Sequence, residues 1–285
     1  MNRSATLSSI AVSLILTCFV LTEPVASQHY WLHTYGEREI SLEVLKPKFD
    51  SYYGYYGYHY SLLNSTWFLS GSFSLTEATA LVVDFPFARY DIDSESSYYQ
   101  DENIVGNPYI GLRISTPEKR VSATAVANFG VRLPFAQGDK YKAASIGMFT
   151  SFDRFEAFVP DLFTFLASGG YLFSFEGGAS ISFTAGGSFM IPTKDGGDPE
   201  MYIDYNLELW YRSDRAGFGS GFTGRLLTTQ SGLSFCERTV HQMGFSGYVD
   251  FGVFRPGLNF RFPLDDDPTP ILDYVYGFSV TFDIE

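Results

Sequence analysis

Histidine, the residue that most often performs acid–base chemistry, is scarce in this sequence. The chain has four histidines in 285 residues. Three of them, His29, His33 and His59, precede every segment with a clear strand pattern, and His241 begins such a segment on its apolar side. Catalysis of acyl transfer by an imidazole needs a nucleophile and an orienting carboxylate, and no serine stands out as a partner. We therefore expect no enzyme and no catalytic residue, and His241 is the residue to test first.

Charged and amide side chains at alternating positions form a second chemical group. In the segment MYIDYNLELWYR they alternate with apolar side chains, and the same pattern recurs elsewhere. If these groups share an interior, they pair with one another across it, or they line an aqueous path and select solutes. Both interpretations stay open. The residues expected to line that interior are Arg113, Arg132, Asp204, Asn206, Glu208, Arg212, Arg225, Asp250, Asn259 and Arg261.

Because apolar and polar side chains alternate with a period of two residues, these segments are predicted to be β-strands. Successive side chains of a strand point to opposite faces, so each segment has one apolar and one polar face. The clearest segments are Met201 to Arg212, Val121 to Leu133, Ala179 to Ile191, Gln242 to Val253 and Asp273 to Ile284. Further candidate strands are Trp67 to Leu75, Thr79 to Arg89, Pro108 to Ser115, Ala216 to Thr229 and Gly257 to Leu264.

The length of these segments favours a membrane. Strands of soluble sandwiches average about 5 or 6 residues, whereas a tilted strand needs roughly 9 to 11 residues to cross the hydrocarbon layer. Aromatic and glycine enrichment, with 28 Phe, 20 Tyr and 27 Gly at 45% hydrophobic residues, fits strands between two membrane interfaces. We predict an all-β fold, a transmembrane antiparallel up-and-down β-barrel of about 12 strands, with ten as the rival number. A large soluble β-protein is the alternative.

One segment is ambiguous. Phe152 to Ala167 reads FDRFEAFVPDLFTFLA, and its aromatic residues fit a strand as well as a short interfacial helix broken at Pro160. The strand number of about 12 counts it as a strand.

The first residues have the plan of a secretory signal. Arg3 lies in a short basic start, an apolar stretch runs from Ile10 to Leu21, and Val25-Ala26-Ser27 is a small-residue cleavage site. We expect residues 1–27 to be a cleaved signal peptide and residues 28–285 to be one barrel domain. Export and a transmembrane barrel together predict the outer membrane of a bacterium.

Charge and cysteine content exclude several classes of function. A net charge of −13, with 19 basic against 32 acidic residues, argues against nucleic acid as a partner. Cys18 lies in the signal and leaves Cys236 alone, so neither an internal disulfide nor a cysteine metal cluster can form. Lipid attachment at Cys18 stays open. Metal-ligand spacings and phosphate-binding glycine loops are lacking, so we expect no metal and no cofactor.

Two polar segments have a structural and a functional interpretation. Tyr52 to Tyr60 reads YYGYYGYHY, which fits an aromatic girdle at one membrane interface or a stacking surface for aromatic or sugar ligands. Asp91 to Glu102 has five acidic residues and no basic one, and is either an exposed loop or a weak divalent-cation site.

Three short motifs carry a resemblance to a known family. They are GNPYIGLRI at 106–114, GVRLPF at 130–135 and RPGLNFRFPL at 255–264. They resemble outer-membrane transporters of the MetA-pathway phenol-degradation type, over roughly residues 81–285. The resemblance implies a small barrel that passes hydrophobic or aromatic compounds, and it brings no catalytic residues.

These observations predict a channel or transporter for small hydrophobic or aromatic compounds. We expect a monomer with outer-membrane lipid as its partner. The alternatives are a structural or adhesion-type barrel with a plugged lumen and, from a third class, a membrane-embedded lipid-modifying enzyme. The solute and the openness of the lumen do not follow from the sequence.

Overall fold

The computed structural model describes residues 38–49, 64–91, 101–115, 123–194, 197–230, 232, 234–265 and 272–284. The expected signal peptide, Cys18 and the tyrosine-rich segment 52–60 lie outside these residues, as does most of the acidic segment 91–102. None of the helices described is long and apolar enough to cross a membrane.

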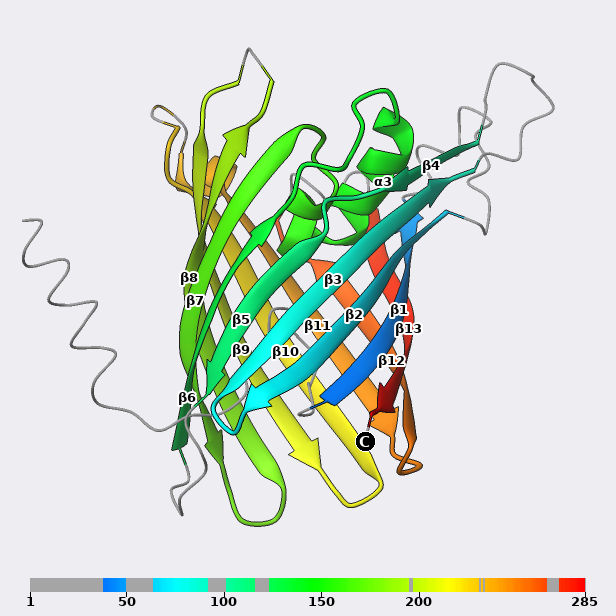
Figure 1. Cartoon of the computed structure of the whole chain (residues 1–285), viewed down its shortest axis with the longest axis vertical. Coiled ribbons are helices and arrows are strands. Elements are labelled where there is room, and N and C mark those ends of the chain that lie inside the picture. Colours follow the sequence, from blue (N-terminus) through cyan, green and yellow to red (C-terminus); the bar gives the residue numbers. More distant parts are fainter. Residues whose placement is uncertain are drawn as a thin grey trace, which may run out of the picture.

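Twelve antiparallel strands of the described chain close into a tilted barrel (Figure 1). They are β1 (Arg38–Phe49), β2 (Ser65–Thr76), β3 (Thr79–Tyr90), β5 (Tyr109–Ser115), β6 (Ala123–Arg132), β7 (Leu162–Ser174), β8 (Ala179–Pro192), β9 (Glu200–Arg212), β10 (Ala216–Leu227), β11 (Thr239–Val249), β12 (Phe254–Pro263) and β13 (Leu272–Asp283). A further short strand, β4 (Glu102–Val105), pairs with the end of β3 only. The predicted barrel and its strand number are confirmed.

Closure comes from the pairing of the two ends of the sheet. β1 pairs with β13 on one side and with β2 on the other, while each remaining wall strand pairs with its neighbours in sequence order. This up-and-down order leaves no unpaired wall edge, and a closed ladder is what the hydrocarbon of a bilayer demands of β-structure.

The two faces of the wall differ as the alternation predicts. Leu207 on β9 is 44% exposed and Phe278 on β13 is 47% exposed, whereas Glu208, next to Leu207, is only 4% exposed. Exposed Phe, Leu, Ile and Val side chains recur around the outer face. A soluble protein would bury this apolar belt, so the outer face is the lipid-facing one.

The connections at the two ends of the barrel are unequal. Short turns join β2 to β3, β7 to β8, β9 to β10 and β11 to β12 at the end where the C terminus lies. The longest described connection, residues 133–161, lies at the other end, and we call it the plug. It contains α3 (Tyr141–Thr150) and the 3-10 helix η1 (Phe152–Ala157), and α3 lies in the mouth of the barrel (Figure 1). At this end, α4 (Phe235–Arg238) precedes β11.

In the plug, the strand counted over Phe152 to Ala167 is wrong for its first half, where the short helix that the sequence left open is present as η1. The interval 152–167 is not one strand, because η1 ends at Ala157 and β7 begins at Leu162. Helix α3 was not predicted at all. Its run KAASIGMF is short and only mildly apolar, and a pattern of period two cannot reveal a helix.

Apolar contacts hold the plug against one side of the wall. Ala143, Ala144 and Ile146 of α3 and Phe158 join a buried cluster with residues of β1, β2, β3, β4 and β13. The ring of Phe158 meets Phe68 of β2 edge to face at 5.7 Å between centroids. A Cβ at Gly147 would lie 2.2 Å from the Phe158 ring, so glycine permits this close approach.

A charge on the outer face tests the membrane assignment. We expect Leu207→Arg to destabilise the barrel in lipid by about 2–4 kcal/mol, because Leu207 lies near the middle of its strand and a guanidinium there enters hydrocarbon. Asp214→Arg, in the exposed turn after β9, is the control. Denaturant unfolding in liposomes measures both, and an unchanged midpoint for Leu207→Arg would contradict the assignment.

Candidate functional site

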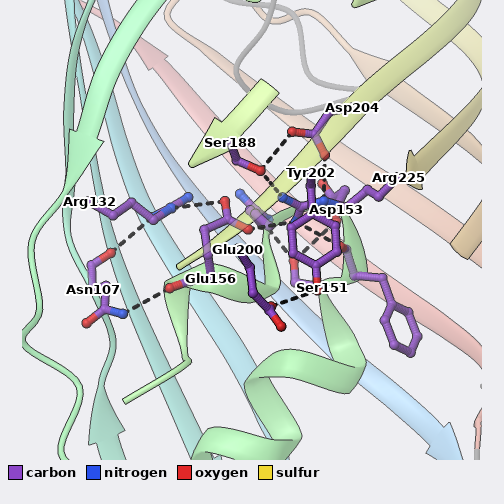
Figure 2. Close-up of polar contacts among 12 residues, drawn as sticks. Asn107, Arg132, Ser151, Asp153, Glu156, Ser188, Glu200, Tyr202, Asp204 and Arg225 are labelled. Atoms are coloured by element: carbon purple, nitrogen blue, oxygen red, sulfur yellow. Dashed lines mark hydrogen bonds and ion pairs between the residues drawn. The ribbon is translucent and has the colours of Figure 1, made fainter. Parts of the chain in front are cut away.

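The candidate site is the contact between η1 and the inner wall (Figure 2). Three charged side chains of η1, Asp153, Arg154 and Glu156, project from the plug into the barrel, and each is almost completely buried. Buried charge is costly unless it is paired. The partners of these three side chains therefore decide whether the plug can occupy the mouth.

Glu156 bridges two arginines from opposite directions. Its Oε1 accepts a hydrogen bond from Nε of Arg132 on β6 at 3.3 Å, and its Oε2 accepts one from Nη1 of Arg225 on β10 at 2.7 Å (Figure 2). Arg225 also donates to Ser188 Oγ at 2.8 Å and its guanidinium lies 4.6 Å from the centroid of the Phe155 ring. One carboxylate of the plug thus joins two strands that are not neighbours.

The other two charges of η1 reach the remaining side of the wall. Arg154 donates to Glu43 of β1 through a short contact. Arg261 of β12 donates to Glu43 Oε1 at 2.8 Å and to Asp153 Oδ1 at 3.1 Å. The plug is therefore held by ion pairs to β1, β6, β10 and β12, in addition to its apolar contacts.

Asn107 fixes the two ends of the plug. Its side-chain oxygen accepts hydrogen bonds from the backbone N–H groups of Phe135 and Ala136, both at 2.9 Å. Its amide nitrogen donates to the carbonyl oxygens of Glu156 at 2.9 Å and Val159 at 2.7 Å. One buried amide thus holds the start and the end of the segment together.

Each of the three wall arginines also has a carboxylate partner on the wall itself. Arg132 Nη1 lies 3.2 Å from Asp84 Oδ2, and Arg225 Nε lies 2.6 Å from Asp204 Oδ1. Arg261 has Glu43 at 2.8 Å. These three arginines consequently have a partner that does not belong to the plug. The ion-pair partners of Asp153 and Glu156, in contrast, lie on the wall.

The structure places most of the expected interior set inside the barrel. Arg113, Arg132, Glu208, Arg225, Asn259 and Arg261 are buried there, while Asp204, Asn206 and Arg212 are half-buried. Asp250 is the exception. It follows the end of β11 and its Oδ1 accepts a hydrogen bond from the Gly252 N–H, so it caps a turn. The alternating sequence pattern continues past the end of β11, because Asp250, the first residue of the turn, falls where the next inward-facing residue would be expected.

Several members of the network were missed by sequence reasoning. The alternation of REISLEVL over 38–45 could have placed Glu43 inward, since Ile40, Leu42 and Val44 oppose it. Asp84 is the single charge within LVVDFPF. Nothing in FDRFEAF shows that Asp153, Arg154 and Glu156 turn inward, because this depends on how the plug folds back.

A cavity of about 80 Å³ lies beside η1 within the lumen. Asp153, Arg154 and Glu156 bound it on the plug side, and side chains from β6 to β10 bound it on the wall side. It has room for roughly five to eight waters. With the plug in place, this cavity has room for a small molecule only.

His241 lies outside the lumen, on the lipid-facing side of β11. Its Nε2 is 2.6 Å from the Tyr205 hydroxyl, and its Nδ1 is 3.0 Å from Asp265 Oδ1. Asp265 also accepts a hydrogen bond from the His241 backbone N–H. This chain of hydroxyl, imidazole and carboxylate has the geometry of an activated nucleophile. The sequence could not reveal this chain of groups, because its members come from β9, from β11 and from Asp265, which lies two residues beyond the end of β12.

No cluster of three or more possible metal ligands occurs among the residues that the structure describes. Of the candidate cation segment, Asp91 pairs with Arg89 at 3.1 Å, and Glu102 accepts a hydrogen bond from the Lys142 N–H at the start of α3 at 3.0 Å. Both described ends of that segment thus serve the protein's own structure.

Similar solved structures share the barrel fold. An outer-membrane channel from Pseudomonas putida F1 matches with a TM-score of 0.63 at 9% identity, over 91% of this chain and 100% of that one. The NanC porin matches with a TM-score of 0.52 at 6% identity, over 87% and 100%. At such identities the likeness establishes the fold, which is that of outer-membrane β-barrels. The finer resemblance to the phenol-degradation type stays a prediction. No protein-family model and no curated protein matches the sequence.

The electrostatics of Glu156 have a consequence for pH. Burial acts to raise the pKa of this carboxyl, but the guanidiniums of Arg225 and Arg132 outweigh it and hold the pKa below its usual range. A lowered pKa in the folded state adds stability above the unfolded pKa, and this stability is lost as the pH falls through the folded value.

Glu156→Gln should lower stability in a pH-dependent way. At pH 7 we expect a loss of about 1.5–3 kcal/mol, the value of hydrogen bonds to a charged group. The difference from wild type should shrink below about pH 4.3, the ordinary glutamate value, because protonated Glu156 resembles glutamine. The gel-mobility shift on heating in detergent gives the unfolding midpoint, with Glu77→Gln in an exposed turn as the control. A difference that does not change with pH would contradict this account of the plug.

Proposed function

We propose that this protein is a channel of the bacterial outer membrane whose mouth is closed by the plug and opens when the plug leaves. Short turns at one end and longer connections at the other are typical of outer-membrane barrels, in which the short turns are periplasmic. This orientation places the plug at the extracellular mouth. A cleaved signal peptide over residues 1–27, a monomeric state and a lipid partner belong to the same proposal.

The observation that carries the proposal is the double pairing of the wall arginines. Arg132, Arg225 and Arg261 each have one carboxylate partner on the wall and one on the plug. Release of the plug would therefore leave each of these three arginines with its wall partner, while Asp153, Arg154 and Glu156 pass into water. In a barrel with a purely structural role, these arginines would not need carboxylate partners that are independent of the plug.

Conductance in planar bilayers tests this function. We expect low conductance from wild type and a time-averaged conductance about 10–100 times higher from Glu156→Gln, since about 1.5–3 kcal/mol changes the ratio of closed to open states by that factor. Glu77→Gln is the matched control. Folded barrels of both proteins that never conduct would favour the plugged structural alternative.

A second candidate function rests on His241. The chain from Tyr205 through His241 to Asp265 lies on the lipid-facing side, at the end of the barrel that contains the plug, and fits hydrolysis of lipid esters. Asp265 would hold the imidazole with its proton on Nδ1, and Nε2 would take the hydroxyl proton as Tyr205 attacks an ester carbonyl. The proton would pass to the departing alcohol, and water would then release the fatty acid.

Tyr205→Phe separates this second function from a structural role of the chain. If the chain is catalytic, wild type releases fatty acid from outer-membrane lipid vesicles and Tyr205→Phe does not, although both show the same unfolding midpoint. Phe222→Leu, at the ring that stacks on His241 at 5.5 Å, is the control for packing. Equal fatty-acid yields from wild type and Tyr205→Phe would exclude the enzyme.

A further inference from the structure

Neutral groups that make hydrogen bonds form one part of the lining of the lumen cavity. Asn128 of β6, Ser168 of β7, Thr184 of β8, Asn206 of β9 and Thr223 of β10 contribute side chains to it from five adjacent strands. Hydroxyl and amide groups both donate and accept hydrogen bonds. This row of groups, which we call the polar row, is the surface that a molecule in the cavity would meet.

The charged groups at the cavity are engaged in ion pairs. Asp204 and Arg225 face each other at 2.6 Å, and Glu156 accepts from two arginines. Arg154 pairs with Glu43, and Asp153 with Arg261. The five carboxylates of this network outnumber its four arginines, so an anion that entered would find no excess of positive charge to replace its hydration.

One group of the polar row can still accept a hydrogen bond from a bound molecule. Asn206 donates from its amide nitrogen to Glu208 at 3.0 Å, but its carbonyl oxygen is buried and has no hydrogen-bond partner within the described residues. An unsatisfied buried acceptor is unfavourable. A donor brought by a guest molecule would remove that cost, whereas a hydrocarbon guest would add to it by covering the other groups of the row.

We propose that this cavity binds small, neutral, polyhydroxylated solutes and that these are the molecules the channel passes. The inference rests on the proposed channel, and it replaces the hydrophobic solutes implied by the family resemblance. A polyol presents hydroxyls to the polar row and C–H groups to the ring of Tyr109 and to Leu166, which also line the cavity. Its size fits, because a four-carbon polyol occupies about the space of the five to eight waters estimated for the cavity.

Liposome swelling tests this inference. Purified wild type and Glu156→Gln are each placed in liposomes, and the rates are compared for erythritol, sodium glutamate and sodium benzoate. We expect erythritol to enter at least about tenfold faster than either anion, above the rate of protein-free liposomes. Benzoate or glutamate entering as fast as erythritol would overturn the solute class while the channel stands. No entry of any solute with either protein would instead refute the channel, and the inference with it.

Two isosteric variants examine the polar row itself. Thr184→Val and Asn206→Leu remove hydrogen-bonding groups at nearly constant volume, and each should lower the erythritol rate severalfold relative to benzoate. Ser220→Ala, on the lipid-facing side of β10, is the control. The heat-induced gel shift verifies that each variant is folded. An unchanged ratio of erythritol to benzoate in both folded variants would overturn the binding role of the row.

Discussion

The pairing of Glu156 with Arg132 and Arg225 is the interaction on which the position of the plug depends. Removing a carboxylate from water is costly, and two guanidiniums at 3.3 and 2.7 Å offset that cost. The same pairing orients η1, which brings Arg154 to Glu43 and Asp153 to Arg261. The plug is thus placed by charge, and the apolar contacts of Phe158 and α3 fix it against one side of the wall.

The alternation of side chains along each strand imposes a second constraint, which links the lipid-facing and the interior face of the wall. Because side chains alternate, a strand that turns Leu207 to lipid must turn Glu208 inward, and the interior of a closed barrel then collects the polar half of every strand. This interior needs either water or internal partners. In this structure, ion pairs fill the region around η1 and a small cavity remains beside it.

Sequence reasoning therefore succeeds for the wall and fails for the plug. The alternation in 201–212 and 273–284 defines strands and faces because one rule, side-chain parity, governs them locally. The same rule explains why Asp250 was wrongly expected in the interior, because the alternation continues from β11 into the turn that follows. The direction of FDRFEAF is set by partners from β1, β6, β10 and β12, far away in sequence, and no local pattern encodes it. The neighbours of His241 were hidden for the same reason.

The interior also links the fold to function. A polar wall whose arginines keep partners of their own is compatible with two positions of the plug, and this is what a channel that opens and closes needs. A wall that depended on the plug for neutrality would be fixed in one state. In the proposed channel, the position of Glu156 between two strands makes it the residue through which a small change in charge would shift that equilibrium.

Access of a thiol reagent to the cavity tests this account most directly. In a Cys236→Ser background, Thr184→Cys places one thiol in the cavity beside η1, and its labelling by a membrane-impermeant maleimide can be followed in intact cells. The account predicts slow labelling when Glu156 is present and labelling about 10–100 times faster when Glu156→Gln is added. Equal rates with and without Glu156 would contradict the claim that this ion pair closes the barrel.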